Sequence, residues 1–110
     1  MIDETIQRIE ARLRSAEAMP ESTREELLHL LATLKSEVAR LPPGKAEQAR
    51  NIALAADRST EQALDADRDP EAYRGTLDNF SGSVREFEES HPKLVQIVNN
   101  IANTLAGLGI

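Results

Sequence analysis

The sequence predicts an all-α protein, an antiparallel helical hairpin followed by further helices that complete a small bundle with coiled-coil-like seams. Apolar residues recur at alternating spacings of four and three, which places them on one face of a helix. The alternation typical of strands is absent. Of the 110 residues 40% are hydrophobic but only 3% are aromatic. A core of aliphatic side chains and alanine favours thin helix–helix packing.

The first two helices are predicted over residues 2–18 and 22–41. Pro20 should end the first, because proline disfavours helical geometry in the residue before it. Ser22 and Glu25 have the spacing of a capping box at the start of the second. The short link between them favours an antiparallel hairpin. The expected core residues are Ile2, Ile6, Ile9, Leu13 and Ala16, then Leu27, Leu31, Leu34, Val38 and Leu41.

The middle of the chain has a weaker pattern. Residues 45–56 follow a Pro-Pro-Gly turn and predict a helix with small residues on its inner face, which would let another helix approach closely. Residues 57–70 are rich in acids, and Leu64 is their only large aliphatic residue. We expect this stretch to be an exposed acidic connector and the least ordered internal segment.

Two C-terminal helices are predicted over residues 71–89 and 91–107. Their apolar positions stay in phase across the junction, so one kinked helix is also compatible with the pattern. We favour two helices, because Pro92 suits a first helical turn and Ser90 is a good N-cap residue. The expected core residues are Tyr73, Leu77, Phe80, Val84 and Phe87, then Leu94, Val98, Ile101, Leu105 and Leu108.

The composition excludes several classes of function. The formal charge is −6 and the basic residues are scattered among acids, so no basic patch for nucleic acid is expected. The absence of cysteine excludes disulfides and thiolate chemistry. No apolar stretch reaches the length of a membrane-spanning helix, and the first residues do not resemble a signal peptide. We therefore expect a cytoplasmic protein.

Two Glu-x-x-His motifs, Glu26 with His29 and Glu88 with His91, are the strongest hint of chemistry. Paired motifs of this kind hold two metal ions in some helical bundles. On a helical wheel, however, Glu26 and His29 turn away from the apolar stripe, and His91 precedes a proline. The glycines match no phosphate-binding pattern. We therefore expect no metal, no cofactor and no enzymatic activity, and His91 should be a junction residue bonded to the backbone.

The end of the chain is unusual because no charged residue follows Lys93, whereas the residues before it carry 12 Lys and Arg and 19 Asp and Glu. Opposite the apolar stripe of the last helix lie four amides, Gln96, Asn99, Asn100 and Asn103. Asparagine is a mediocre helix former, and amides can be buried without the desolvation cost of a charge. We hypothesise that this face contacts a second copy or a partner helix.

These observations predict a non-enzymatic helical structural or interaction protein. It would form a homo-oligomer, most simply a dimer, or bind another helical protein. One alternative is a membrane-surface protein that uses residues 92–110 as an interfacial helix, although such helices usually carry several basic residues on the polar face. A di-metal carboxylate bundle is the least favoured alternative.

The helix junction has a recognisable sequence pattern, Phe-Glu-x-Ser-His-Pro-x-Leu, followed by an apolar helix that ends in Gly-Ile. This pattern resembles the C-terminal part of a family of short bacterial proteins classed only as a domain of unknown function. Residues 6–10, 20–41 and 46–53 are similar as well, so the resemblance spans nearly the whole chain. It implies no activity, cofactor or substrate. The matching junction positions are Phe87, Glu88, Ser90, His91, Pro92 and Leu94.

Overall fold

The structure is a computed structural model that describes residues 2–108. Within them the chain forms five α-helices and two short 3₁₀ turns without any strand, so the predicted all-α class is confirmed. The elements in chain order are α1 (Ile2–Ser15), α2 (Glu21–Ala39), η1 (Pro43–Lys45), α3 (Ala46–Ala63), α4 (Pro70–Gly82), η2 (Arg85–Phe87) and α5 (Pro92–Leu108).

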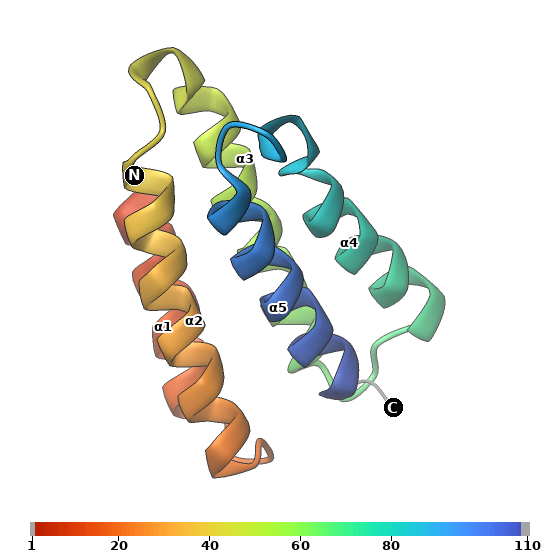
Figure 1. Ribbon diagram of the computed structural model, residues 1–110. Helices are drawn as coiled ribbons and strands as arrows, with labels where there is room; N and C mark the ends of the chain where they lie inside the picture. Colours follow the sequence, from red (N-terminus) through yellow and green to blue (C-terminus); the bar gives the residue numbers. More distant parts are fainter. Residues whose placement is uncertain (1, 109–110) are drawn as a thin grey trace.

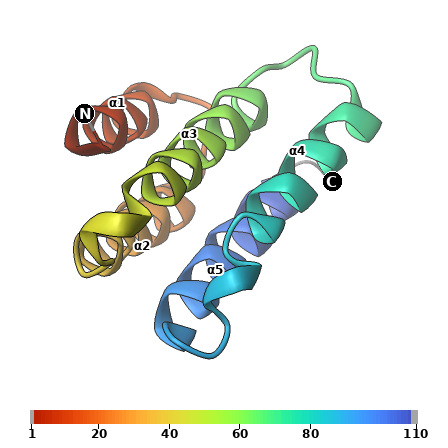
Figure 2. The ribbon, with the colours of Figure 1, turned by 90° about the horizontal axis from the view of Figure 1, so that it is seen from above.

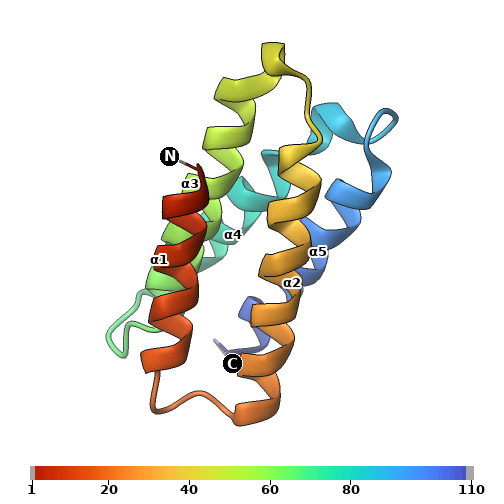
Figure 3. The same ribbon diagram turned by 90° about the vertical axis from the view of Figure 1, so that its left-hand side faces the viewer.

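The helices alternate in direction along the chain. α1, α3 and α5 run one way, and α2 and α4 run the other (Figures 1 and 3). Four of them form a ring, in which α1 contacts α2 and α3, and α5 contacts the same two helices. α4 lies outside this ring and packs against α3 and α5 (Figure 2). The predicted hairpin of the first two helices is present, and α5 contacts three neighbouring helices on one side.

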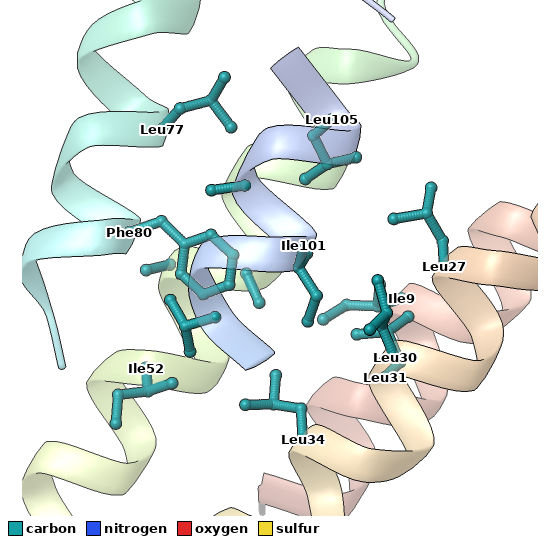
Figure 4. Close-up of a cluster of buried hydrophobic side chains, with 14 of the residues drawn as sticks. Ile9, Leu27, Leu30, Leu31, Leu34, Ile52, Leu77, Phe80, Ile101 and Leu105 are labelled. Carbon is teal, nitrogen blue, oxygen red and sulfur yellow. The ribbon is translucent and has the colours of Figure 1, made fainter. Parts of the chain in front are cut away.

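The predicted apolar stripes meet in one core. Ile9 of α1, Leu31 of α2 and Ile101 of α5 are at most 1% exposed, and they lie together with residues of α3 and α4 in Figure 4. The expected core residues that stay only partly buried are Ile2, Ala16, Leu41 and Leu108. Every helix is therefore stabilised by burying its apolar side chains in the core of its own chain.

α3 is the central helix, and its small residues explain how it fits. It contacts α1, α4 and α5, and its buried positions include Ala49, Ala53 and Ala56. Small side chains let the neighbouring helices approach closely. Ser59 and Thr60 are also buried, and Thr60 Oγ1 donates to the carbonyl oxygen of Ala56 at 2.9 Å.

The acidic connector predicted over residues 57–70 is shorter than expected, because α3 continues to Ala63. Two of its acids face α1: Asp57 Oδ2 lies 2.9 Å from Arg8 Nη2, and Glu61 Oε2 lies 3.0 Å from Arg12 Nη1. Both pairs are separated by 49 residues, as expected of two parallel helices in register. The acidic composition predicted a poorly ordered segment, but α1 supplies charges of the opposite sign to its first part.

The predicted start of α2 was wrong in detail. The helix begins at Glu21, directly after Pro20, and no side chain caps it. Ser22 and Glu25 therefore form no capping box, and both are exposed. A side-chain cap occurs instead at α4, where Asp69 accepts a hydrogen bond from the backbone N–H of Glu71 at 3.4 Å.

The region after Pro70 contains two helices, as favoured above, with a break earlier than expected. α4 ends at Gly82, and the rest of the predicted 71–89 helix is replaced by the turn η2. Val84 and Phe87 remain fully buried in this turn. The chain then reverses, and Pro92 occupies the first position of α5.

Candidate functional site

The outward face of α5 carries the four amides singled out by the sequence, Gln96, Asn99, Asn100 and Asn103, and all four are exposed. The opposite face of the helix is buried, with Leu94, Val98, Ile101 and Leu105 at most 1% exposed. α5 lies between α2 and α4 in Figure 1. The apolar stripe therefore faces its own chain, and the amides face away from it.

The side chains of these amides make no polar contact within the described chain. Within residues 2–108 none of their side chains makes a hydrogen bond or an ion pair to another residue. The only charged residue of α5 is Lys93, whose Nζ lies 3.9 Å from the buried Glu37 of α2. Charge is thus confined to the beginning of the helix, and the rest of its outward face is neutral.

The helix-junction residues form a structural turn. The His91 ring meets Phe87 edge-on at 5.7 Å between centroids, and its Nδ1 lies 3.0 Å from Ser90 Oγ. The backbone N–H of His91 donates to the carbonyl of Phe87 at 2.8 Å. Leu94 enters the core, and Glu88 is exposed. Ser90 is therefore not the residue that directly precedes α5, and the His91 ring bonds a hydroxyl rather than a backbone group.

The Glu-x-x-His motifs do not converge on a site. Glu26 and His29 are exposed on α2, as their helical positions predicted. Among residues 2–108 no group of three acidic or histidine side chains lies close enough to hold a metal ion. In the same range, none of the helices has the length and hydrophobicity needed to cross a membrane.

Sequence reasoning missed two arginines at the lower end of the bundle in Figure 1, where α1, α3 and α5 finish. Arg24 of α2 donates to the carbonyl of Leu13 at 2.9 Å, near the end of α1. Arg68 donates to the carbonyl of Ala63 at 3.2 Å and to that of Leu108 at 2.8 Å, at the ends of α3 and α5. A helix C-terminus leaves carbonyls unsatisfied and carries partial negative charge, so a guanidinium there is stabilising.

Tyr73 of α4 completes this arrangement. Its hydroxyl donates to the carbonyl of Leu105, and the Arg68 guanidinium lies 5.3 Å from the centre of its ring. Burial raises the pKa of Tyr73 to about 12, although the nearby Arg68 acts in the opposite direction. One signal in the sequence could have suggested these contacts: α5 has no basic residue in its last turn, so any cation there must come from another segment.

A cleft of about 570 Å³ opens at the same end, between residues 15–19, the end of α3 and Leu108. Its cations are already engaged, since Arg12 pairs with Glu61 and Arg68 bonds main-chain carbonyls. It is therefore a weaker candidate than the face of α5.

Comparison with known proteins places most of the chain in one family. Residues 27–110 match the family described as a domain of unknown function (DUF4404). No curated protein and no solved structure matches the chain. The matched range includes the helix junction and α5, while α1 and the first turns of α2 lie outside it. Since the match covers more than half of the chain, the protein belongs to the family of the domain of unknown function DUF4404.

Proposed function

We propose that this protein is a non-enzymatic helical interaction protein of the cytoplasm that self-associates, or binds a helix of another protein, through the outward face of α5. The observation that carries this proposal is the exposed row of Gln96, Asn99, Asn100 and Asn103, whose side chains have no partner within residues 2–108.

The chemistry of this face supports contact with protein rather than with water alone. The other helices present charged residues to solvent, and the chain as a whole has 32 charged side chains. Three asparagines lower helix propensity. Amides, unlike carboxylates or ammonium groups, can leave water at modest cost when they find hydrogen-bond partners.

The same chemistry favours a second copy as the partner. A two-fold interface uses the same patch on both subunits, so groups near the axis meet their own kind. An amide both donates and accepts and can pair with an identical amide, whereas like charges repel. The alternating apolar spacing of the helices is not evidence of self-association, because these stripes are buried within one chain.

The burial of the apolar stripe also argues against the membrane-surface alternative. Leu94, Val98 and Ile101 are fully inside the bundle, and α5 would have to leave its core to present them to lipid. The amide face, which is free, offers lipid no apolar surface. An interaction with protein fits the folded state better.

Sedimentation equilibrium over a wide range of concentrations tests the proposal. We expect a reversible dimer for the native chain and a monomer for the triple variant N99E/N100E/N103E. The matched control is Q7E/N51E/N79E, which adds the same charge at exposed positions of α1, α3 and α4, and which should still dimerise. A native chain that is monomeric at every concentration would contradict self-association, and equal effects of the two variants would contradict the role of α5.

A further inference from the structure

We propose that a second cleft, between α3 and α4, binds a short peptide of about three residues through its backbone, one apolar side chain and its free C-terminal carboxylate. This cleft has a volume of about 370 Å³ and is lined by residues of α3, the end of α4 and the turn η2. α3 and α4 lie side by side in Figure 2. No described residue of α5 lines the cleft, so the site is separate from the face of α5 and goes beyond the proposed function.

Gln48 gives the first indication of a ligand. Among residues 2–108, four buried side-chain atoms have no hydrogen-bond partner, and they belong to Gln48, Asp57, Ser59 and Gln62. Of these four residues, Gln48 alone lines either this cleft or the one at the lower end of the bundle. A buried acceptor without a partner costs free energy, so Gln48 Oε1 is suited to an N–H donor from a bound molecule.

Leu54 gives the second indication. It is 43% exposed, it is the only large hydrophobic residue among residues 2–108 that is exposed, and it lines the same cleft. Water can satisfy the oxygen of Gln48, but water does not remove an apolar side chain from solvent. A ligand that satisfies both residues therefore carries a hydrogen-bond donor and an apolar group.

The charge of the cleft selects an anionic group. Two charged side chains of the described chain line it, and one of them, Glu86, is already paired with Lys45 at 3.1 Å between Oε2 and Nζ. The other, Arg58, makes no ion pair or hydrogen bond within residues 2–108. The free charge of the cleft is thus one guanidinium, whose N–H groups match the two oxygens of a carboxylate.

The amides of the cleft favour a peptide as the molecule that carries these groups. Asn51 of α3 and Asn79 of α4 line the cleft from its two helices, and neither side chain makes a hydrogen bond within the described range. Each side-chain amide offers donors and an acceptor, which match the N–H and C=O groups of an extended backbone. No described aromatic residue lines the cleft, so it lacks the ring on which a nucleobase would stack.

The dimensions of the cleft set the length of the peptide. Gln48 and Arg58 are separated by about 15 Å along α3, at 1.5 Å per residue. An extended peptide covers about 3.3–3.6 Å per residue, so roughly three residues and the reach of the two side chains span this distance, with Leu54 beside the peptide. The volume lies near the lower limit of ligand sites, about 300 Å³, which favours a free short peptide over the tail of a protein.

Titration of the isotope-labelled full chain with N-acetyl-Ala-Leu-Ala, followed by the NMR shifts of its backbone amides, tests the site. The C-terminally amidated peptide lacks the charge, and N-acetyl-Ala-Ala-Ala lacks the large apolar side chain. The variant R58Q removes the guanidinium. The matched control is R50Q, at an exposed position of α3 that does not line the cleft. The spectrum of each variant without peptide shows that it is folded.

We expect saturable shifts at residues 48–58 and 79–86, and binding of N-acetyl-Ala-Leu-Ala at least about tenfold tighter than of either altered peptide. In R58Q the acid and the amidated peptide should bind equally weakly, because the carboxylate has lost its partner. R50Q should behave like the native chain, because its substitution lies outside the cleft.

The absence of saturable shifts at peptide concentrations on the order of ten millimolar would overturn the proposal and leave the cleft to water. A preference for the acid that survives in R58Q would overturn it as well. Binding tightened at least about tenfold by a flexible Gly-Ser extension at the N-terminus of the peptide would replace the free peptide with the tail of a protein. These shifts report on α3 and α4, whereas sedimentation reports on assembly, so failure here is distinguishable from failure of the proposed function.

Discussion

α3 and α5 both pack against three other helices, but they use their polar residues differently. Two acids of α3, Asp57 and Glu61, face α1 and pair with its arginines. The outward amides of α5 find nothing within residues 2–108. Polar groups with partners inside the chain are explained by the fold, whereas for the amides of α5 we have proposed a contact outside it.

The buried faces of the two helices should be equally important for stability. Ile52→Ala in α3 and Ile101→Ala in α5 each remove a side chain that is at most 1% exposed. Each should lower the free energy of unfolding by about 2–5 kcal/mol, from lost apolar burial and the cavity left behind. Urea denaturation measures both. If Ile101→Ala lowered the free energy of unfolding by less than about 1 kcal/mol, α5 would contribute little to the core, and the two buried faces would not be equally important.

Arg68 connects the ends of both helices, so its removal should affect them together. Arg68→Ala should cost about 1–3 kcal/mol, because it leaves the carbonyls of Ala63 and Leu108 without their charged donor. Hydrogen exchange should show faster opening in the last turns of α3 and α5. Arg68→Lys is the control and should retain part of the stability through its charge. Faster exchange in only one of the two helices would show that Arg68 stabilises the end of that helix alone.

Alkaline pH should weaken the attachment of α4 to α5 through Tyr73. Its pKa rises from 10.0 to about 12 on folding, chiefly through burial. The unfolded chain therefore loses this proton first, so the stabilisation is fully present below pH 10 and is lost as the pH approaches about 12. Denaturation across this pH range should show a decline in the free energy of unfolding. The Tyr73→Phe variant should lack the part of the decline that comes from the tyrosine hydroxyl. If the free energy of unfolding declined equally in the variant, the decline would come from other residues.

The outward polar groups should give the smallest effects, with opposite signs on stability. Arg12→Ala should destabilise the chain by up to about 1 kcal/mol, as expected for a partly exposed ion pair. The variant N99A/N100A/N103A should leave the monomer unchanged or stabilise it by a few tenths of a kcal/mol per residue, because alanine favours helix. Denaturation at a protein concentration at which sedimentation shows a monomer compares them. Clear destabilisation by the alanine variant would give the amides a role inside the chain.

Periodicity was enough to predict the helices and their buried faces, because each apolar stripe is determined by residues that are close together in the sequence. Leu31 and Ile101 could be placed in the core on spacing alone. The extension of α3 to Ala63 could not be predicted, because residues 57–63 contact Arg8 and Arg12, which are distant in sequence. Long-range ion pairs leave no periodic signal.

The candidate face was predictable for the same reason that the core was, since the four amides occupy one side of a regular helix. The contacts of Arg68 and Tyr73 were not predictable, because their acceptors are main-chain carbonyls, which every residue carries. The junction was predicted in outline, but the role of Ser90 was not, because a hydroxyl can bond a backbone group or a neighbouring ring such as His91.

The parallel register of α1 and α3 has a consequence for the part of the chain that matches the family. The matched range begins at residue 27, so it omits the helix that supplies Ile6, Ile9 and Leu13 to the core. A fragment cut at that boundary would expose the apolar sides of α2 and α3 to water and leave Asp57 without its arginines. We therefore expect a fragment of residues 27–110 of this chain to be less stable than the whole chain, because α1 covers one side of the core.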